Sequence, residues 1–373
     1  MTNIGLINPK QKHLFSMKET IPTRYSRQTI LPQIKKEGQL QLMAAKVLVI
    51  GAGGLGSPVL TYLAAMGIGH IGVVEFDLVD ETNLNRQFIY RAADKGKKKV
   101  DAAKKILTEQ NPLVNWEFHD LYINRDNVIE LIMPYDIVVD GSDNFDTRYL
   151  LNDACILADK VLVSGAIHQF HGQVSVFNYQ QGPTYRCIFP QQPEAQSAPN
   201  CAEAGIMGAT AGVIGSLQAM EVVKVICGIG EVLSGKLLLI DLLHHDQQLI
   251  QFKLNPENRT VKSLPFPKEE RCFIPAEGDQ FEDSPANWKT KYPEGILLDI
   301  REDYEQEEFP VEGSHHVPLS TLPDYFKNNQ TKSPMLVFCQ NGIKSKTACL
   351  WIKENYPSLT VSELAGGIDK YQN

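Results

Sequence analysis

The stretch that decides the fold is Lys46-Val-Leu-Val-Ile-Gly-Ala-Gly-Gly-Leu-Gly56, an apolar run that ends in glycines. Residues 46–51 are apolar without alternation, which is typical of a strand buried on both faces of a parallel sheet. Residues 57–66 follow as a predicted helix, so the glycines lie at a strand-to-helix turn. There they let the backbone pass close to a phosphate group, which a helix N-terminus attracts. The glycines of this turn are Gly51, Gly53, Gly54 and Gly56.

A carboxylate stands at the end of the next predicted strand, residues 71–76. Glu75 lies about 20 residues beyond the turn, where an acidic side chain can accept hydrogen bonds from ribose hydroxyls. The pattern predicts a nucleotide site but does not distinguish NAD from ATP. A nicotinamide-dependent dehydrogenase is therefore one hypothesis, and binding of NAD in preference to ATP would support it.

Strands and helices alternate along residues 24–254, which predicts a doubly wound, Rossmann-like α/β sheet. Further strands are expected over 135–140 and 160–164, with edge or antiparallel strands over 173–179, 236–241 and 248–253. Residues 255–287 are rich in Pro, Lys, Glu and Asp without periodicity, which indicates a linker. The predicted parts are an N-terminal extension (1–22), a nucleotide-binding domain (23–254), the linker (255–287) and a smaller α/β domain (288–373).

Composition narrows the classes of function. The chain has 373 residues and a net charge of -8 without a basic block, which argues against sequence-independent binding to nucleic acid. Its seven cysteines are an odd number and too few for a disulfide scaffold, so a reducing cytoplasm is expected. The apolar stretch 47–76 is interrupted by glycines and Pro58, which fits two strands around a helix better than a membrane span.

Polar side chains follow the ends of several predicted strands. Asn83, Asn85, Arg86 and Gln87 come just past Glu75, Lys99 opens the next helical region, and Asp143 and Asn144 follow the strand over 135–140. In a parallel sheet these segments meet at one crevice. A dinucleotide site does not need Arg, Lys and Asp together at the phosphates. Chemistry at the α-phosphate of ATP does, because cations neutralise the developing charge and a carboxylate holds Mg²⁺.

These motifs together resemble the MoeB/ThiF/HesA family, bacterial relatives of the ubiquitin-activating enzymes. The resemblance covers about residues 20–254 and rests on six segments. They are Arg24-Tyr-Ser-Arg-Gln28, the glycine turn, Asn83-Leu-Asn-Arg-Gln87, the Lys99 segment, Ser142-Asp-Asn144 and Gly215-Ser-Leu-Gln-Ala219. It implies a homodimer that adenylates the C-terminal glycine of a ubiquitin-like sulfur carrier ending in Gly-Gly.

The resemblance also implies roles for individual residues. Glu75 would bind ribose, Asn83, Arg86 and Lys99 would contact phosphates, and Asp143 would bind Mg²⁺. Arg27 would reach into the site of the neighbouring protomer. The chemistry agrees with this assignment, since the carrier's terminal carboxylate is already an anion at neutral pH and needs no general base. The site has to hold two anions together and stabilise departure of pyrophosphate.

The cysteines depart from the family pattern. The family usually binds structural zinc with two Cys-x-x-Cys pairs, but this chain keeps only Cys187 of the first pair and has no cysteine over 255–267. Four thiolates cannot be assembled there, so no zinc is expected. Cys201 precedes the helix predicted over 202–227, where the helix dipole lowers the pKa of a thiol. In related enzymes a cysteine at this place links covalently to the activated carrier, although an inert capping thiol is the alternative.

The C-terminal third resembles a rhodanese-like domain. Cys339 directly follows the predicted strand 335–338 and opens a short loop before a helix, where backbone N–H groups stabilise a thiolate or persulfide. The family more often has Arg where this chain has Lys344, which puts the preferred sulfur donor in doubt. Asp299-Ile-Arg-Glu302 and Leu364-Ala-Gly-Gly-Ile368 complete the resemblance.

The leading hypothesis is therefore an ATP- and Mg²⁺-dependent adenylyltransferase fused to a sulfurtransferase. Cys339 would take sulfur from a donor such as a cysteine desulfurase and pass it to the carrier adenylate. Carriers of molybdopterin, thiamine-thiazole and tRNA-thiolation pathways all fit, with a slight preference for the molybdopterin type. A noncatalytic scaffold that binds a carrier without releasing pyrophosphate is the third hypothesis.

Overall fold

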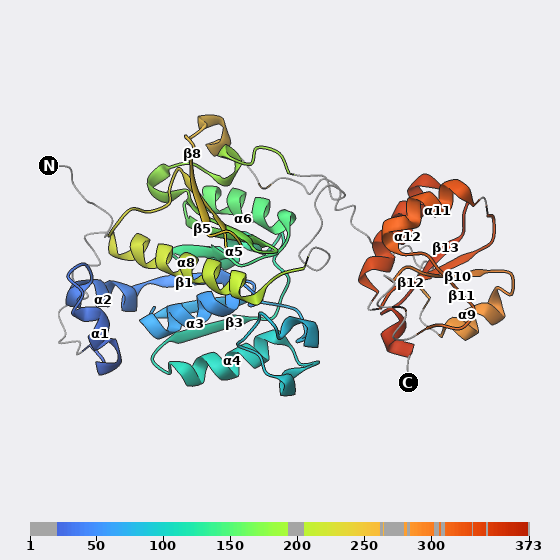
Figure 1. Ribbon diagram of the computed structural model, residues 1–373, viewed down its shortest axis with the longest axis horizontal. Coiled ribbons are helices and arrows are strands. Elements are labelled where there is room, and N and C mark those ends of the chain that lie inside the picture. The colour runs from blue at the N-terminus through green and yellow to red at the C-terminus, as the bar shows by residue number, and fades with distance from the viewer. Residues whose placement is uncertain are drawn as a thin grey trace. The chain divides into compact units, whose positions relative to one another are not determined.

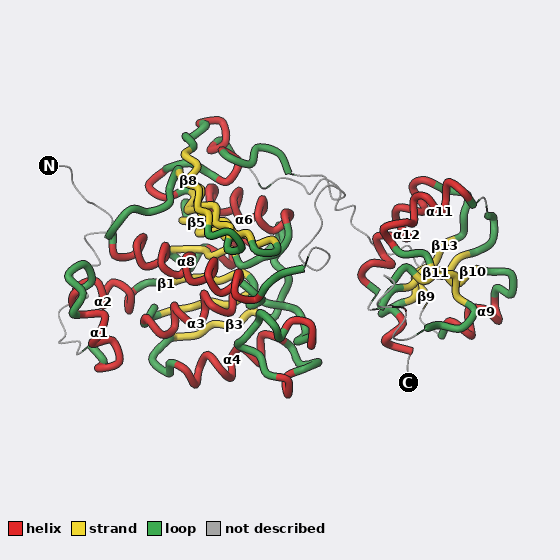
Figure 2. The backbone as a smooth tube through the Cα atoms, viewed as in Figure 1, coloured by secondary structure: helices red, strands yellow, loops and turns green. Residues whose placement is uncertain are grey.

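The structure is a computed structural model that describes residues 21–192, 205–261, 264, 280–281, 284–301, 306, 310–329, 331–340 and 342–371. The chain divides into two compact units, Met1–Pro267 and Lys268–Asn373. Each unit contains its own β-sheet flanked by helices (Figures 1 and 2). The two units are described separately below.

The first unit is built on an eight-stranded sheet in the order β3-β2-β1-β4-β5-β6-β7-β8. The first five strands in this order are parallel, and β6, β7 and β8 join them as antiparallel neighbours. This confirms the predicted doubly wound α/β class. The strands are β1 (Lys46–Ile50), β2 (His70–Val74), β3 (Asn115–His119), β4 (Ile137–Asp140), β5 (Val161–His168), β6 (His171–Phe177), β7 (Lys236–Asp241) and β8 (Asp246–Gln251).

Helices cover both faces of this sheet, and the alternation along β1 shows why. Val47 and Val49 pack into a core with α3 (Gly56–Met66), α4 (Lys99–Gln110) and α8 (Gly208–Cys227). Leu48 and Ile50 pack on the opposite face, in a core with α5 (Val128–Ile132) and α6 (Phe145–Leu157). Both sets of β1 side chains are therefore buried, as the continuous apolar run predicts. Two short helices, α1 (Ser26–Thr29) and α2 (Lys35–Ala44), precede β1.

Helix α8 is 20 residues long and mostly apolar. By length and composition alone it could cross a bilayer, and it is the one such helix among the described residues. Half of the apolar stretch of α8 is buried inside the protein. Its apolar side chains, including Ile214, Ala219 and Val222, belong to the cores beside the sheet. The hydropathy of α8 is thus accounted for by packing within the first unit.

The strand order creates the crevice in which a ligand can bind. From β1 the chain moves outward to β2 and β3, then returns to the other side of β1 at β4 and continues to β5. The connections leaving the carboxyl ends of β1 and β4 consequently diverge to opposite faces. In open α/β sheets such a reversal leaves a crevice outside the strand ends, which is the usual ligand site.

The glycine turn at this crevice leaves little room for a side chain at Gly51 and none at Gly56. Gly51 has a φ of +89°, a conformation that favours glycine. A Cβ atom on Gly56 would lie 2.0 Å from the Gly51 carbonyl oxygen. The first turn of α3 can therefore pack directly against the end of β1 only because both residues are glycines.

The second unit has a smaller parallel sheet in the order β11-β10-β12-β13-β9. Its strands are β9 (Gln280–Phe281), β10 (Ile296–Asp299), β11 (Ser314–His316), β12 (Met335–Phe338) and β13 (Val361–Leu364). Helices α9 (Pro285–Lys291), α11 (Leu322–Asn328) and α12 (Ile343–Asn355) pack beside it. The smaller α/β domain predicted from the sequence is thereby confirmed in class.

The segment predicted as a linker, 255–287, contains short elements of regular structure near both of its ends. A 3-10 turn over Pro256–Arg259 belongs to the first unit, since Arg259 donates a hydrogen bond to the Asn178 side chain at 2.8 Å. At the other end, β9 pairs with β13 and α9 begins at Pro285. These elements are too short to produce a periodic apolar pattern, so the sequence did not reveal them.

Candidate nucleotide-binding site

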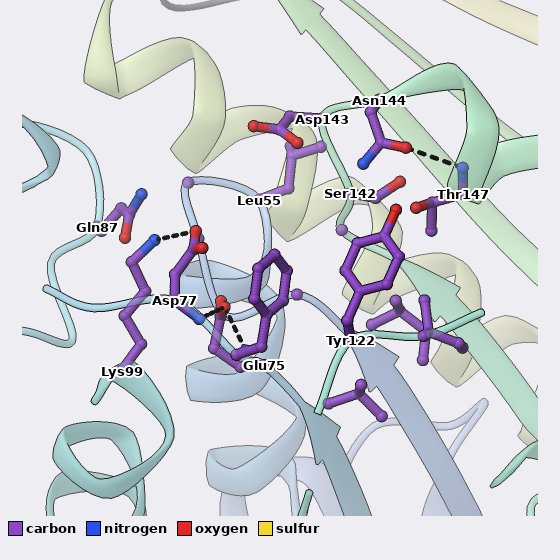
Figure 3. A pocket seen from close by; sticks show the side chains of 18 of the residues that line it. Leu55, Glu75, Asp77, Gln87, Lys99, Tyr122, Ser142, Asp143, Asn144 and Thr147 are labelled. Atoms are coloured by element: carbon purple, nitrogen blue, oxygen red, sulfur yellow. Dashed lines mark hydrogen bonds and ion pairs between the residues drawn. The ribbon is translucent and has the colours of Figure 1, made fainter. Parts of the chain in front are cut away.

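A pocket of about 900 Å³, including the part open to solvent, lies at the crevice beside the glycine turn. Most of the residues predicted for a nucleotide site line it: Gly51, Gly53, Gly54, Glu75, Arg86, Gln87, Lys99, Asp143 and Asn144. Figure 3 shows Lys99 and Gln87 on one side of the pocket and Asp143 and Asn144 on another. Side chains from β2, α4 and the β4–α6 loop therefore converge here, although they are far apart in sequence.

Glu75 braces the glycine turn from the end of β2. The residue is 6% exposed, and one carboxylate oxygen accepts a hydrogen bond from the Ala52 N–H at 2.9 Å. The other oxygen accepts from the N–H groups of Phe76 at 2.9 Å and Asp77 at 3.0 Å. A carboxylate has about four acceptor positions, so some capacity remains for a ribose hydroxyl. Glu75 is thus a structural support of the turn as well as a candidate ligand group.

Lys99 is held by a residue that the sequence analysis did not single out. Its ammonium lies 3.0 Å from the Asp77 carboxylate, and its side chain is only 6% exposed. The Lys99 backbone N–H also donates to the Asp77 carbonyl, which fixes the start of α4 against the end of β2. Asp77 stands two residues after Glu75 at the same strand end. This spacing could have identified Asp77 from the sequence as a second carboxylate at the pocket.

Arg86 and Gln87 approach the turn from the loop after β2. Arg86 donates to the Thr82 carbonyl at 2.9 Å and to the Asn85 side chain at 3.0 Å, and its aliphatic part lies next to Gly54. The side-chain oxygen of Gln87 is buried and has no hydrogen-bond partner in the described part of the chain. Asn83, Asn85 and Gly56 are not among the residues that line this pocket. Their predicted contact with a ligand stays a prediction.

Asp143 lies in the short loop between β4 and α6. Its carboxylate makes no hydrogen bond or ion pair with any described residue, and it faces the pocket (Figure 3). The next residue, Asn144, caps α6 by accepting the Thr147 N–H at 2.8 Å. Arg148 also lines the pocket from α6, and sequence analysis missed it because one arginine inside a helix resembles a surface charge.

Arg27 lies away from the pocket of its own chain. The neighbouring Gln28 donates to the Met66 carbonyl at 3.0 Å, and Met66 ends the 11-residue helix α3. Since α3 begins beside the glycine turn, its far end is about 16 Å away. Arg27 is exposed and does not line this pocket.

Two cysteines of the first unit bear on the predictions made from the sequence, Cys201 and Cys187. Cys201 lies outside the described residues, so its predicted role stays a prediction. Cys187 accepts hydrogen bonds from the N–H groups of Thr184 and Asn255, each at 3.4 Å, and from the Asn258 amide at 3.7 Å. Burial raises the pKa of the Cys187 thiol, but these donors outweigh it and hold the pKa below its ordinary value. The expected absence of zinc likewise stays a prediction.

In the second unit Cys339 stands at the end of β12, where the sequence analysis expected it. Its sulfur is almost fully buried and accepts a hydrogen bond from the Ser345 N–H at 3.4 Å, in the first turn of α12. Gly342, with a φ of +85°, begins that turn. Arg301 is also fully buried, pairs with Asp299 at 2.6 Å and donates to Gln340 at 3.2 Å. The cysteine loop is thus supported by a buried ion pair next to it.

Two family models match successive parts of the chain. The model of the ThiF family matches residues 25–262, well over half of the chain. The chain belongs to the ThiF family. A rhodanese-like domain model matches residues 281–373, so the ThiF-family part is followed by a rhodanese-like part. The family resemblance noted from the motifs is thereby confirmed.

Several curated proteins are similar to this ThiF-family chain. The "Sulfur carrier protein adenylyltransferase" of Thermus thermophilus is 50% identical over 238 residues, covering 62% of this chain and 88% of that protein. "Adenylyltransferase and sulfurtransferase MOCS3" of Drosophila persimilis is 37% identical, covering 92% and 82%. "Probable adenylyltransferase/sulfurtransferase MoeZ" of Mycobacterium tuberculosis is 37% identical, covering 92% and 91%. The last two share both parts of the chain.

Solved structures resemble the first unit. The structure of E. coli MccB with AMPCPP and the peptide MccA has a TM-score of 0.57 at 23% identity, covering 64% of this chain and 74% of that one. At this level of identity the likeness shows a shared fold.

The contacts of Glu75 lead to a testable prediction. Glu75→Gln replaces one acceptor oxygen by an amide that cannot accept, so at least one buried N–H loses its partner. We expect a loss of about 1–3 kcal/mol in the free energy of unfolding and weaker ATP binding, measured by chemical denaturation and calorimetric titration. Glu81→Gln is the matched control, because Glu81 is exposed and forms only a surface pair with Lys95. Equal stability of the two variants would contradict the bracing role of Glu75.

Proposed function

We propose that this enzyme uses ATP to adenylate the C-terminal glycine of a ubiquitin-like sulfur carrier and then converts that glycine to a thiocarboxylate. The observation that carries the proposal is the convergence of Arg86, Lys99 and Asp143 on one pocket beside the glycine turn. The family is one of ATP-using adenylyltransferases, and relatives that span both units are named adenylyltransferase and sulfurtransferase. The relative from Thermus thermophilus, named for a sulfur carrier protein, supports the choice of substrate.

The first step joins two anions. An oxygen of the carrier's terminal carboxylate attacks the α-phosphorus of ATP, and the bond to the β-phosphate breaks so that pyrophosphate leaves. Lys99 and Arg86 provide positive charge where the phosphates gather, and Gln87 offers a buried polar group near Gly53. In a pocket partly shielded from water such charges stabilise the transition state more strongly than in water. No base is required, because the attacking carboxylate is already ionised.

The residues present fit a magnesium ion. Asp143 offers an unpartnered carboxylate at the pocket, and Mg²⁺ is usually bound by one or two carboxylates together with substrate phosphates. When bound, the ion would neutralise charge on the phosphate oxygens. Among the described residues no group of three or more His, Cys, Asp or Glu side chains could hold a metal by itself. Binding together with ATP is therefore the form in which we expect it.

We further propose that the enzyme is a homodimer in which Arg27 completes the neighbour's pocket. Arg27 cannot serve its own pocket, because it lies at the opposite end of α3. Beside it, Ile30 and Leu31 are 70% and 48% exposed, which would be unfavourable if this face met only water. Contact with a second copy would cover these side chains and carry Arg27 toward the other site.

The rhodanese-like part would supply the sulfur. A donor such as a cysteine desulfurase would transfer a sulfane sulfur to Cys339, which would form a persulfide. The terminal sulfur of the persulfide would attack the acyl carbon of the adenylate, and AMP would leave. A second thiol, for which we propose Cys201, would then attack the Cys339 sulfur, form a disulfide with it and release the thiocarboxylate. All five described cysteines are unbridged, which is compatible with a reducing cytoplasm.

The alternatives make different predictions. A dehydrogenase would not need Lys99, Arg86 and Asp143 together, and it leaves Cys339 without a role. A scaffold would bind the carrier but release no pyrophosphate. Among carriers, the molybdopterin type remains our preference over the thiazole and tRNA-thiolation types. Pyrophosphate exchange measured with each candidate Gly-Gly carrier distinguishes these possibilities.

Arg86→Ala tests the adenylation step. Loss of a charge that acts on the transition state should cost about 3–4 kcal/mol, or roughly 100- to 1,000-fold in the rate of ATP–pyrophosphate exchange. Arg91→Ala is the control, because Arg91 lies in the same segment but donates to the Phe88 and Tyr90 carbonyls and does not line the pocket. Near-normal exchange in Arg86→Ala would refute the assigned role.

Mixed dimers test the role of Arg27. If Arg27 acts on the neighbour, Arg27→Ala and Arg86→Ala should each be inactive alone. A mixture allowed to exchange subunits should regain pyrophosphate exchange, because one pocket of each mixed dimer then holds an intact Arg86 and an intact Arg27. Absence of any recovery, although the subunits exchange, would show that Arg27 does not act across the dimer.

Cys339→Ala separates the two activities. We expect loss of sulfur transfer from thiosulfate to cyanide and of thiocarboxylate formation, with pyrophosphate exchange unchanged. Cys349→Ala, in α12 of the same unit, is the control because Cys349 is a buried core residue away from the loop start. Retained thiosulfate activity in Cys339→Ala would place the sulfur-carrying thiol elsewhere.

A further inference from the structure

The loop that carries Asp143 is held from behind by a buried ion pair. Asp140, the last residue of β4, is completely buried, and the Arg148 side chain is 10% exposed. The Arg148 Nε lies 3.8 Å from an Asp140 carboxylate oxygen. A buried charged pair contributes little to stability compared with apolar packing, so its presence at the pocket calls for another explanation.

Asp140 and Arg148 both form hydrogen bonds with Ser142 of the loop. One oxygen of Asp140 accepts the Ser142 N–H at 3.0 Å and the Ser142 hydroxyl at 2.6 Å. Arg148 donates from Nη2 to the Ser142 carbonyl at 3.1 Å. The N–H, the hydroxyl and the carbonyl of Ser142 are therefore all bound, and the residue immediately before Asp143 is fixed in place.

The pair is itself anchored in the surrounding elements. The second oxygen of Asp140 accepts the Ser164 hydroxyl from β5 at 2.9 Å, and its carbonyl accepts from Gln218 of α8 at 2.7 Å. Strand β5 and helix α8 thus fix where Asp140 lies.

Asp143 is consequently the one residue of the loop whose side chain is not engaged by a described residue. Ser142 is fixed on one side, and Asn144 is fixed on the other because it caps α6. The backbone on both sides is constrained while the carboxylate points to the pocket (Figure 3). Such an arrangement reduces the number of positions that the carboxylate can adopt before a ligand arrives.

We propose that Asp140 and Arg148 are positioning residues that hold the Asp143 carboxylate where it binds the Mg²⁺ of MgATP. This inference rests on the proposed function, since it takes MgATP as the ligand. Arg148 acts through the loop, because its Nη2 is bound to Ser142 and its charge is balanced by Asp140. The pair therefore matters for binding that involves the metal and not for binding of the nucleotide alone.

Calorimetric titration of the full-length protein with ATP, in Mg²⁺ and separately in EDTA, tests the proposal. In Arg148→Met we expect the affinity for ATP in Mg²⁺ to fall about 10- to 100-fold, the range seen when groups that orient metal ligands are removed. The affinity in EDTA should match that of the unchanged protein. Arg148→Lys keeps the positive charge but loses the planar guanidinium, so its affinity for ATP in Mg²⁺ should lie between those of Arg148→Met and the unchanged protein. Asp140→Asn should lower this affinity, as Arg148→Met does.

Arg186→Met is the matched control. Arg186 also forms a bidentate ion pair with a buried carboxylate of α6, at 2.8 and 2.7 Å from Asp153, but it does not line the pocket. Both arginine variants should lower the unfolding temperature, and only Arg148→Met should change the response to Mg²⁺. If Arg148→Met does not fold, Arg148→Lys and Asp140→Asn decide the question by the same measurement.

Two results would overturn the inference. Equal losses of affinity in Mg²⁺ and in EDTA would mean that Arg148 contacts the phosphates directly. An equal loss in Arg186→Met would mean that any weakening near α6 has this effect. Failure of the proposed function would be seen in a different experiment. In that case no carrier would support pyrophosphate exchange, while Arg148→Met could still change the response of ATP binding to Mg²⁺.

Discussion

The direct contact between the start of α3 and the end of β1 determines where a nucleotide can bind. A side chain on Gly56 would collide with the Gly51 carbonyl, so the helix N-terminus can approach the strand end only through glycine. That approach directs backbone N–H groups of the turn into the pocket. Glu75 then locks the turn by accepting the Ala52 N–H. The remaining groups of the pocket are arranged around this rigid corner.

The pocket combines fixed charges of both signs. Lys99 is held by Asp77, and Arg148 is held by Asp140, so each cation that is nearly buried has a carboxylate beside it. Pairing lowers the cost of keeping charge in a site from which water is partly excluded. Arg86, which is only partly buried, and Asp143 have no oppositely charged partner among the described residues. The pocket thus combines paired charges, Lys99 included, with unpaired ones, which suits chemistry that must bring a carboxylate to a triphosphate.

Sequence reasoning located several charged and polar residues of the pocket, because they occur in segments that follow strands. Arg86 lies in the segment after β2 and Asp143 in the loop after β4, and parallel strands bring their carboxyl ends to one edge. Asp77 and Arg148 escaped notice for a different reason. Arg148 is a single charged residue inside a helix, and the position of Asp77 two residues after Glu75 was not used; the importance of each appears only when its partner in another element is known. The short strands β3 and β9 were also missed, since β3 is partly exposed and β9 has only two residues, too few for an alternation.

The sequence alone determined the fold class, the order of the two parts, the glycine turn and several of the charged residues that line the pocket. These follow from local patterns, namely apolar periodicity, glycine spacing and the position of polar residues after strands. Only the tertiary structure decided that Arg27 lies away from its own pocket, that Glu75 supports the turn and that Arg148 supports the loop of Asp143. Such relations depend on contacts between segments far apart in the chain, because the strand order and helix packing, and no local pattern, set the distances between them.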